Sequence, residues 1–188
     1  GVFERNVYLV KRYFWWDVAF FVWTVANTLT IVFIAEGIEA TGGQIDVGQV
    51  TTILLVGAVV WAYLGIIFEI LTETVAWERW EGTLEYTFMA PVRRYTQLLG
   101  STAFAVAYAV IQMVIILVVM LLFFDVEFSG GNWVTAAVFL ALGSISFVGV
   151  GMMAAILPLL YVERGDQMVF VIQSIILLFS GVYYDPTI

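Results

Sequence analysis

Long apolar segments recur along the chain and constrain its fold more than any other feature. A helix rises ~1.5 Å per residue, so about 20 consecutive apolar residues cross the hydrocarbon core of a bilayer. Five segments reach or approach this length, and they cover roughly residues 14–35, 50–71, 98–124, 133–161 and 168–184. The sequence therefore predicts an all-α membrane protein with a single transmembrane domain and about five transmembrane helices.

The composition supports this class and excludes several others. Hydrophobic residues make up 63% of the chain and charged residues only 12%, whereas soluble proteins are about half apolar and about a quarter charged. The absence of cysteine and histidine excludes disulfides, thiolate ligands and Ser/His/Asp triads. A net charge of −8 argues against nucleic-acid binding, which needs a basic face. We expect no catalytic residue, no metal site and no cofactor held by this chain.

The basic residues predict how the helices are oriented. The loops at residues 36–49 and 125–132 contain five carboxylates and no lysine or arginine. All basic side chains lie before the first predicted span, between the second and third, or between the fourth and fifth: Arg5, Lys11, Arg12, Arg79, Arg93, Arg94 and Arg164. Cytoplasmic loops are enriched in Lys and Arg. The pattern predicts a multi-pass protein of the cell membrane with its N-terminus in the cytoplasm.

Residues 1–13 have the pattern of an amphipathic helix. Phe3, Val7, Val10 and Phe14 recur at helical spacing, and such a stripe suits a helix that lies in the membrane interface. The alternative is a water-exposed start of the first membrane helix.

The charged stretch at residues 72–97 is too long for a tight turn and carries two helical stripes. One is apolar and the other acidic, and they comprise Trp77, Trp80, Leu84 and Phe88, and Glu78, Glu81 and Glu85. Gly82 interrupts the pattern and predicts an elbow between two helices, and Pro91 ends it. Aromatic and charged side chains together suit docking into a groove of another protein. The alternative is a connection that lies flat on the lipid.

Polar residues inside the predicted spans have two interpretations. For Asn27, Gln112 and Gln173 we favour hydrogen bonds between helices, although Asn27, Thr30 and Gln112 are also candidates for a translocation path. Glu69 and Glu73 are intramembrane acids, and they allow an alternative function as an ATP-independent channel or a proton-coupled secondary transporter. An intramembrane enzyme that uses carboxylates and a divalent cation is the weakest reading, because these acids have no clustered partners in the sequence.

The fourth predicted span has a small side and a proline near its end. Pro158 predicts a kink. Small residues permit close helix packing, and those on this span are Gly143, Ser144, Ser146, Gly149 and Gly151.

Residues 78–85 (ERWEGTLE), followed by residues 90–94 (APVRR), resemble the cytoplasmic stretch of ABC-2 type transporter permeases. Residues 179–184 (FSGVYY) resemble the fifth helix of that family near the outer face. Placed on the hydropathy pattern, the resemblance covers nearly the whole chain. No GxxxxGK[ST] phosphate-binding loop occurs, so an ATP-driven process would need its ATPase on another chain.

The resemblance implies an exporter subunit with six membrane helices, so a last helix is expected beyond Ile188. It implies a separate ATP-binding subunit that holds ATP and Mg²⁺, and a second permease copy as homodimer or heterodimer. The cargo would be an amphipathic drug, a lipid or a lipid-linked glycan. The residues that would couple to the ATPase are Glu78, Arg79, Glu81, Gly82, Thr83 and Glu85.

Overall fold

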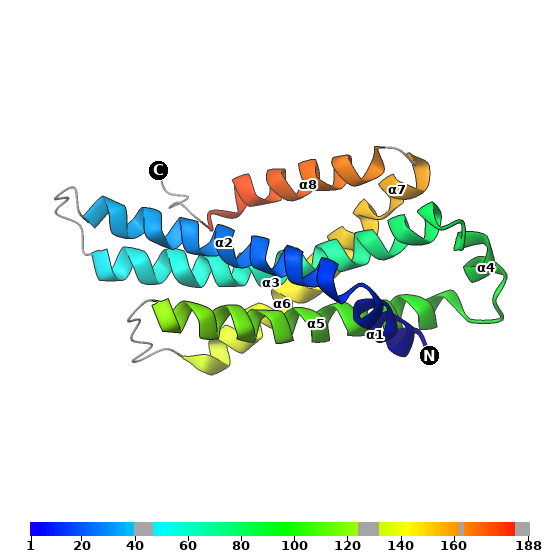
Figure 1. Ribbon diagram of the computed structural model, residues 1–188, viewed down its shortest axis with the longest axis horizontal. Helices are drawn as coiled ribbons and strands as arrows, with labels where there is room; N and C mark the ends of the chain where they lie inside the picture. Colours follow the sequence, from blue (N-terminus) through cyan, green and yellow to red (C-terminus); the bar gives the residue numbers. More distant parts are fainter. Residues whose placement is uncertain (40–46, 124–131, 162–163, 183–188) are drawn as a thin grey trace.

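The structure is a computed structural model that describes residues 1–39, 47–123, 132–161 and 164–182. The described residues form eight helices and no strand (Figure 1). These helices are α1 (Val2–Arg12), α2 (Phe14–Glu39), α3 (Val47–Trp80), α4 (Leu84–Met89), α5 (Arg94–Phe123), α6 (Trp133–Ala154), α7 (Ile156–Leu160) and α8 (Gly165–Ser180). The prediction of an all-α membrane protein is confirmed.

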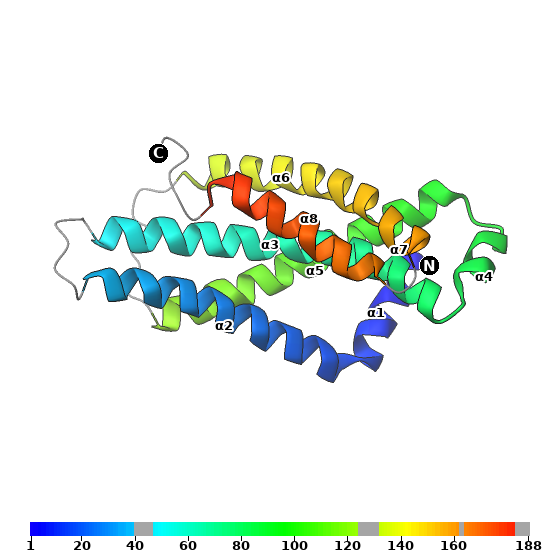
Figure 2. The same cartoon turned by 90° about the horizontal axis from the view of Figure 1, so that it is seen from above.

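Helix α3 lies at the centre of the bundle. It contacts α2, α5 and α6 along its length, and α4, α7 and α8 towards its C-terminal end (Figures 1 and 2). Leu55, Ile67 and Phe68 of α3 are almost completely buried. In its most apolar window 44% of the residues are buried, against 17% in α5 and 22% in α6. An apolar helix that is covered on most sides is a core helix, whereas the outer helices keep apolar faces exposed.

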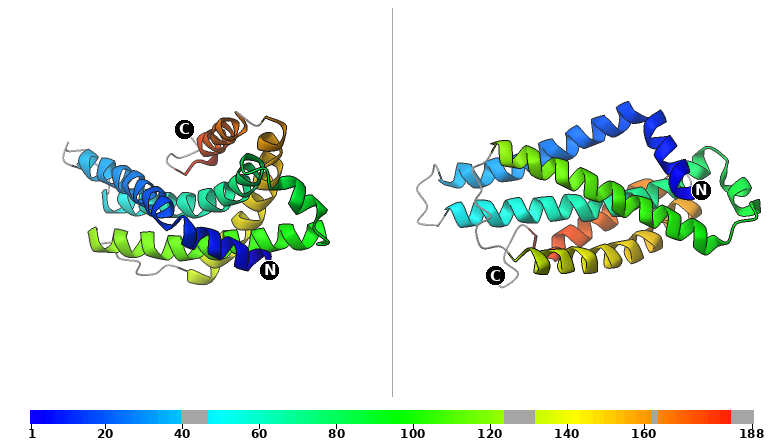
Figure 3. Two further views of the ribbon diagram at one scale, coloured as in Figure 1. Left: turned by 45° about the vertical axis from the view of Figure 1, so that its right-hand side comes forward. Right: turned by 90° about the horizontal axis from the view of Figure 1, so that it is seen from below.

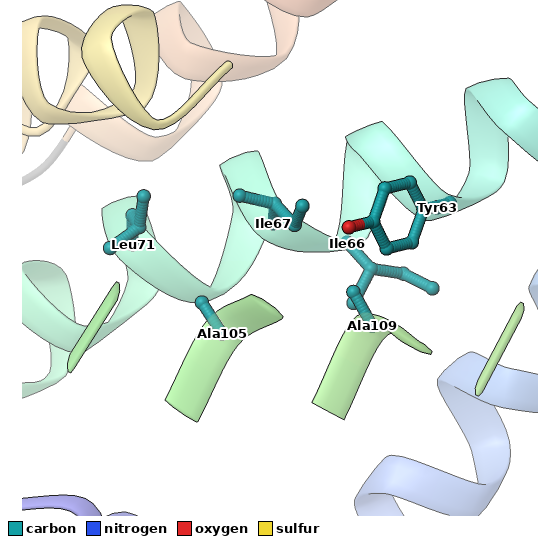
Figure 4. Packing of buried hydrophobic residues seen from close by; sticks show 6 residues of the cluster. All are labelled: Tyr63, Ile66, Ile67, Leu71, Ala105 and Ala109. Carbon is teal, nitrogen blue, oxygen red and sulfur yellow. The ribbon is translucent and has the colours of Figure 1, made fainter. Parts of the chain in front are cut away.

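Small side chains allow α5 to approach this core closely. Ala105 and Ala109 of α5 are fully buried and lie against Tyr63, Ile66 and Leu71 of α3 (Figure 4). In a membrane, helices associate through packing and hydrogen bonds rather than through the hydrophobic effect. The two alanines therefore stabilise the contact because they bring the two backbones together.

Helix α6 packs on α3 through the small side predicted from the sequence. A Cβ atom added at Gly151 would meet Phe68 and Leu71 of α3 at 3.5 and 3.4 Å. The Tyr63 hydroxyl and the Ser144 hydroxyl share a buried hydrogen bond of 2.7 Å across the same seam. The predicted role of these small residues in close packing is confirmed for Ser144 and Gly151.

The predicted kink near Pro158 is present as a break between α6 and α7. Helix α6 ends at Ala154, and α7 starts at Ile156. Proline has no N–H, so residue 158 cannot bond the carbonyl four positions earlier, at Ala154. The interruption at Ala155 thus lies next to the carbonyl that loses its bond, while Trp133–Leu160 still forms one helical stretch of 28 residues.

Three helices are both long and apolar enough to cross a membrane within the described residues: Thr52–Trp80, Arg94–Phe123 and Trp133–Leu160. Helix α2 has 26 residues, and α8 has 16, which correspond to ~39 and ~24 Å at ~1.5 Å per residue. Membrane crossing by α2 and α8 stays a prediction. Helix α3 has 34 residues and continues to Trp80, so residues 72–80, which we assigned to the cytoplasmic coupling segment, belong to the same helix as the second predicted span.

Helix α1 is separate from α2 and turns sharply away from it at Tyr13 (Figures 2 and 3). It packs on α5, where Gly100 lies so close that an added Cβ would be 2.8 Å from the Cβ of Val2. The alternative, in which residues 1–13 only extend the first membrane helix, is wrong. Phe3 and Phe14 of the predicted apolar stripe remain 44% and 54% exposed, a position that suits contact with lipid.

The three basic regions of the sequence gather at one end of the bundle. Helix α1, the α4 region and the turn between α7 and α8 lie together at the right of Figure 1. The C-terminal ends of α2 and α5 and the N-terminal ends of α3 and α6 lie at the opposite end. Which of the two ends faces the cytoplasm stays a prediction from the distribution of Lys and Arg.

Candidate coupling elbow and adjoining cavity

A tight turn reverses the chain at the end of α3. The N–H of Glu81 donates to the carbonyl of Trp77 at 2.9 Å, and the N–H of Thr83 donates to the carbonyl of Glu78 at 2.9 Å. Gly82 has φ 67°, a left-handed conformation that glycine adopts without steric cost. The predicted elbow is present, and we use this name for residues 81–93.

The elbow carries exposed aromatic and acidic side chains. Tyr86 and Met89 are 76% and 81% exposed, and Glu81, Glu85 and Phe88 are also exposed. We call these five residues the elbow surface. Helix α4, which carries four of them, lies at the opposite end of the molecule from the C-terminal end of α2 (Figures 1 and 2).

The Arg94 side chain connects the elbow to the following helix. The Arg94 guanidinium lies over the Phe88 ring at 5.2 Å from its centroid, a distance typical of a cation–π contact. Pro91 follows the end of α4, as predicted. The elbow is thus attached at both ends, to α3 through the turn and to α5 through Arg94.

The structure divides the predicted coupling residues into two groups. Glu81, Gly82 and Glu85 are exposed. Glu78 is buried, and its Oε1 lies 2.7 Å from Nη1 of Arg5 on α1. The other two residues, Arg79 and Thr83, are half-buried, and the Thr83 hydroxyl donates to the Glu78 carbonyl at 3.3 Å. Contact of all six residues with an ATPase stays a prediction, but Glu78 is directed into its own chain.

Helix α1 fixes the end of α3 at a second point. The Tyr13 ring stacks on the Trp77 ring at 5.9 Å between centroids. Together with the ion pair between Arg5 and Glu78, this contact holds the last two turns of α3 against α1. Sequence reasoning missed Arg5 and Tyr13 as parts of the site, because no local pattern connects them to residues so distant in the chain.

A cavity of about 850 Å³ adjoins the elbow. It is open to the outside and is lined by α1, the start of α2, the end of α3, the elbow and the start of α5. We call it the interfacial cavity. Its wall is mostly apolar and aromatic, and its charged side chains are Arg5, Asp17, Glu73, Glu78 and Glu81.

Several polar nitrogen atoms beside this cavity have no partner among the described residues. Asn6 is only 4% exposed, and its Nδ2 makes no hydrogen bond. The Nε and Nη2 atoms of Arg5 are likewise buried without an acceptor. Buried donors are almost always paired in proteins, so these atoms indicate a place where an acceptor is missing.

Glu69 and Glu73 have different surroundings. Gln173 of α8 donates from Nε2 to Oε1 of Glu69 at 3.2 Å, whereas Glu73 faces the interfacial cavity. The hydrogen bond between helices predicted for Gln173 is confirmed. No group of three metal-ligating side chains occurs in the part of the chain that the structure describes.

The other polar residues of the spans bond within their own helices. Asn27 donates to the carbonyl of Trp23 at 2.9 Å, and Thr30 donates to its own helix at 2.8 Å. The bond to another helix predicted for Asn27 is therefore wrong, because its partner lies within the same helix. The bond predicted for Gln112 stays a prediction. Asn27 and Thr30 are exposed on α2 and do not line the interfacial cavity, and their place in a translocation path stays a prediction.

Comparison with known proteins places these features in one family. No curated protein and no solved structure matches the chain. The ABC-2 type transporter family matches residues 7–188, which include α2 to α8, the elbow and most of α1. With this match over nearly the whole chain and the helical membrane fold, the chain belongs to the ABC-2 type transporter family.

Proposed function

We propose that this chain is the permease subunit of an ABC-2 exporter and that a separate ATP-binding subunit docks on the elbow surface. The observation that carries the proposal is the position of this surface. It projects from the end that gathers the basic residues, and one unbroken helix connects it to the core. Exposed aromatic side chains supply binding energy, and the neighbouring carboxylates supply orientation.

The geometry supports mechanical coupling through α3. This helix runs without a break from Val47 to Trp80, and its end is clamped to α1 by Arg5 and Tyr13. A rigid helix carries a displacement at one end to its packed neighbours along its length. Movement of the docked elbow would therefore reach Leu55 in the core, where α3 packs against α2 and α5.

The sequence leads us to expect that ATP binds to another chain. The chain has no phosphate-binding loop, so ATP and Mg²⁺ would be held by the partner subunit. Two permease copies would form the membrane unit in the cell membrane, with α1 and the elbow in the cytoplasm, as the seven basic residues predict. The cargo would be an amphipathic drug, a lipid or a lipid-linked glycan that leaves the cytoplasm.

The test is co-purification of the full-length protein in mild detergent with its endogenous partners. We expect a chain with a phosphate-binding loop in stoichiometric amounts, together with ATP hydrolysis. The double variant Glu81→Lys and Glu85→Lys reverses two charges on the elbow surface and should abolish co-purification of the ATPase chain. The matched control is Glu4→Lys, which reverses an exposed charge on α1 outside the elbow.

Two results would overturn the proposal. One is a double variant that retains both the partner and ATP-driven transport. The other is a wild-type protein that purifies alone and moves solutes in liposomes without ATP. The second result would favour a channel or a proton-coupled transporter and would direct attention to Glu69 and Glu73.

A further inference from the structure

Two basic residues end α1 without a counter-ion. Lys11 and Arg12 occupy its last turn, and both are exposed. We call them the basic pair. Neither forms an ion pair with a carboxylate in the part of the chain that the structure describes. In contrast, Arg5, the remaining basic residue of α1, is paired with Glu78 at 2.7 Å. The end of α1 therefore presents two positive charges that the protein itself leaves unpaired.

The carboxylates on either side of the basic pair in the sequence do not neutralise it. Glu4 precedes Lys11 by seven residues, which is about two helical turns or ~10 Å. Asp17 faces the interfacial cavity. Lys11 instead borders a different groove, and the residues of α1 that line this groove lie on the opposite face of the helix from those that line the cavity. The field at the end of α1 therefore attracts an anion.

Aromatic contacts fix where the two positive charges lie. Nζ of Lys11 is 5.9 Å from the centroid of the Tyr8 ring, and the Arg12 guanidinium is 5.6 Å from the centroid of the Tyr13 ring. Both distances are typical of cation–π contacts. The Tyr13 ring also stacks on Trp77 of α3. The basic pair is thus held in place relative to the bundle rather than carried on a loose end.

An exposed apolar surface begins directly after the basic pair. Trp15 and Trp16 in the first turn of α2 are 80% and 60% exposed, and Phe20 and Trp23 farther along α2 are also exposed. The junction of α1 and α2 lies at the edge of the bundle (Figures 2 and 3). Tryptophan is enriched where the hydrocarbon of a membrane meets the headgroups. A partner of the basic pair is therefore next to hydrocarbon.

The groove beside Lys11 gives the partner a second property. It has a volume of about 590 Å³, is open to the outside and lies between α1 and the start of α5. Its wall is mostly apolar and includes Phe3, Val7 and Gly100. A partner that suits both the charge and this surface has a negative headgroup and an apolar body. A soluble acidic protein would match the charge alone.

We propose that the basic pair and the tryptophans after it bind anionic phospholipid and enrich it at the junction of α1 and α2. The headgroup phosphate lies beside Lys11 and Arg12, and the apolar chains lie against the exposed aromatic surface. The chain as a whole carries a net charge of −8, which disfavours anionic lipid. The preference therefore comes from this local pair. The inference is independent of the proposed ATPase partner.

The experiment measures which lipid lies beside the junction in the full-length protein, in phosphatidylcholine nanodiscs without any ATPase. The chain has no cysteine, so Trp15→Cys provides one site for a bimane label. The quenchers are phosphatidylglycerol and phosphatidylcholine, each with a nitroxide on one acyl chain and each added as a small share of the lipid. We expect phosphatidylglycerol to associate at least about threefold more strongly, because each basic residue near a membrane surface contributes up to about fivefold.

Two variants test whether the charges cause this preference. Lys11→Gln with Arg12→Gln removes both charges and should reduce the preference to about onefold. Lys11→Arg with Arg12→Lys keeps both charges and should retain it. Quenching by nitroxide-labelled phosphatidylcholine should be the same in all three proteins, which shows that the label stays in place. A bimane label attached through Leu122→Cys, at the exposed opposite end of α5, should show no preference for phosphatidylglycerol.

Three results would overturn the proposal. The first is equal quenching by the two lipids at residue 15 of the otherwise unchanged protein. The second is a preference that persists after Lys11→Gln with Arg12→Gln, in which case the pair only stabilises the C-terminal end of α1. The third is a label that neither lipid quenches, which would mean that protein covers the junction. Because no ATPase is present, each of these results is distinct from a failure of the elbow to bind its partner.

Discussion

The ion pair between Arg5 and Glu78 makes a quantitative prediction about how α1 is held. The pair joins the interfacial helix to the last turn of α3 at a distance of 2.7 Å. The Glu78 side chain is 11% exposed and that of Arg5 is 40% exposed. Arg5→Met keeps the length and apolar stem of the side chain but removes its charge. It leaves a nearly buried carboxylate without a partner.

The free energy lost in Arg5→Met follows from how exposed the two side chains are. Loss of one partner costs about 3–5 kcal/mol for a fully buried pair, and fully exposed pairs contribute about 0–1 kcal/mol. The contact satisfies the distance for an ion pair, but Oε1 of Glu78 makes no well-aligned hydrogen bond. We therefore expect Arg5→Met to weaken the attachment of α1 by about 1–2 kcal/mol. This corresponds to roughly tenfold faster exchange of protected amides in α1.

Hydrogen exchange of the protein in nanodiscs, followed by mass spectrometry, measures how often α1 detaches, through the exchange of the amides of residues 2–12. The double variant Arg5→Met and Glu78→Gln removes both charges, so its α1 should exchange more slowly than that of Arg5→Met alone. Glu4→Gln is the control for a charge change on the same helix. If Arg5→Met leaves the exchange of α1 unchanged, or if the double variant exchanges as fast as Arg5→Met, the ion pair does not hold α1.

Two further predictions concern the elbow and the seam between α3 and α6. Gly82→Ala places a Cβ at φ 67° and should lower the free energy of unfolding by about 1–2 kcal/mol, measured as a lower unfolding midpoint in detergent. The control Gly82→Asn should lose less stability. Equal stability of Gly82→Ala and wild type would contradict the assigned turn. Tyr63→Phe removes the 2.7 Å hydrogen bond to Ser144 and should cost about 0.6 kcal/mol, with an upper bound near 1.7. In a double-mutant cycle with Ser144→Ala the two losses should not add, and full additivity would show that the bond contributes nothing.

The features predicted from the sequence are those that local patterns encode. The helical class follows from apolar segment length, the position of the elbow from Gly82, and the break near the end of α6 from Pro158. Each rests on a rule that acts within a few residues, such as the left-handed conformation of glycine or the missing N–H of proline. The separate helix α1 follows in the same way from its charged and apolar periodicity.

The remaining features depend on contacts between distant segments. Glu78 belongs to an acidic stripe by spacing, but tertiary packing turns it towards Arg5, so it differs from Glu81 and Glu85 in exposure. Likewise Glu69 and Glu73 share a spacing of four residues, yet one bonds to α8 and the other faces the interfacial cavity. Helical periodicity tells which residues share a face, but it does not tell which neighbour covers that face.

The elbow and the interfacial cavity share residues, and this has a thermodynamic consequence. Glu81 belongs to the elbow surface and also lines the cavity, and Glu78 lines the cavity where α1 clamps α3. A change in the position of Glu78 or Glu81 on the cavity side therefore also changes the surface on which the ATPase is proposed to dock. Coupling between two binding sites is reciprocal. Any ligand of the interfacial cavity that changes the affinity of the elbow for the ATPase subunit would therefore have its own affinity changed by the same factor when that subunit docks.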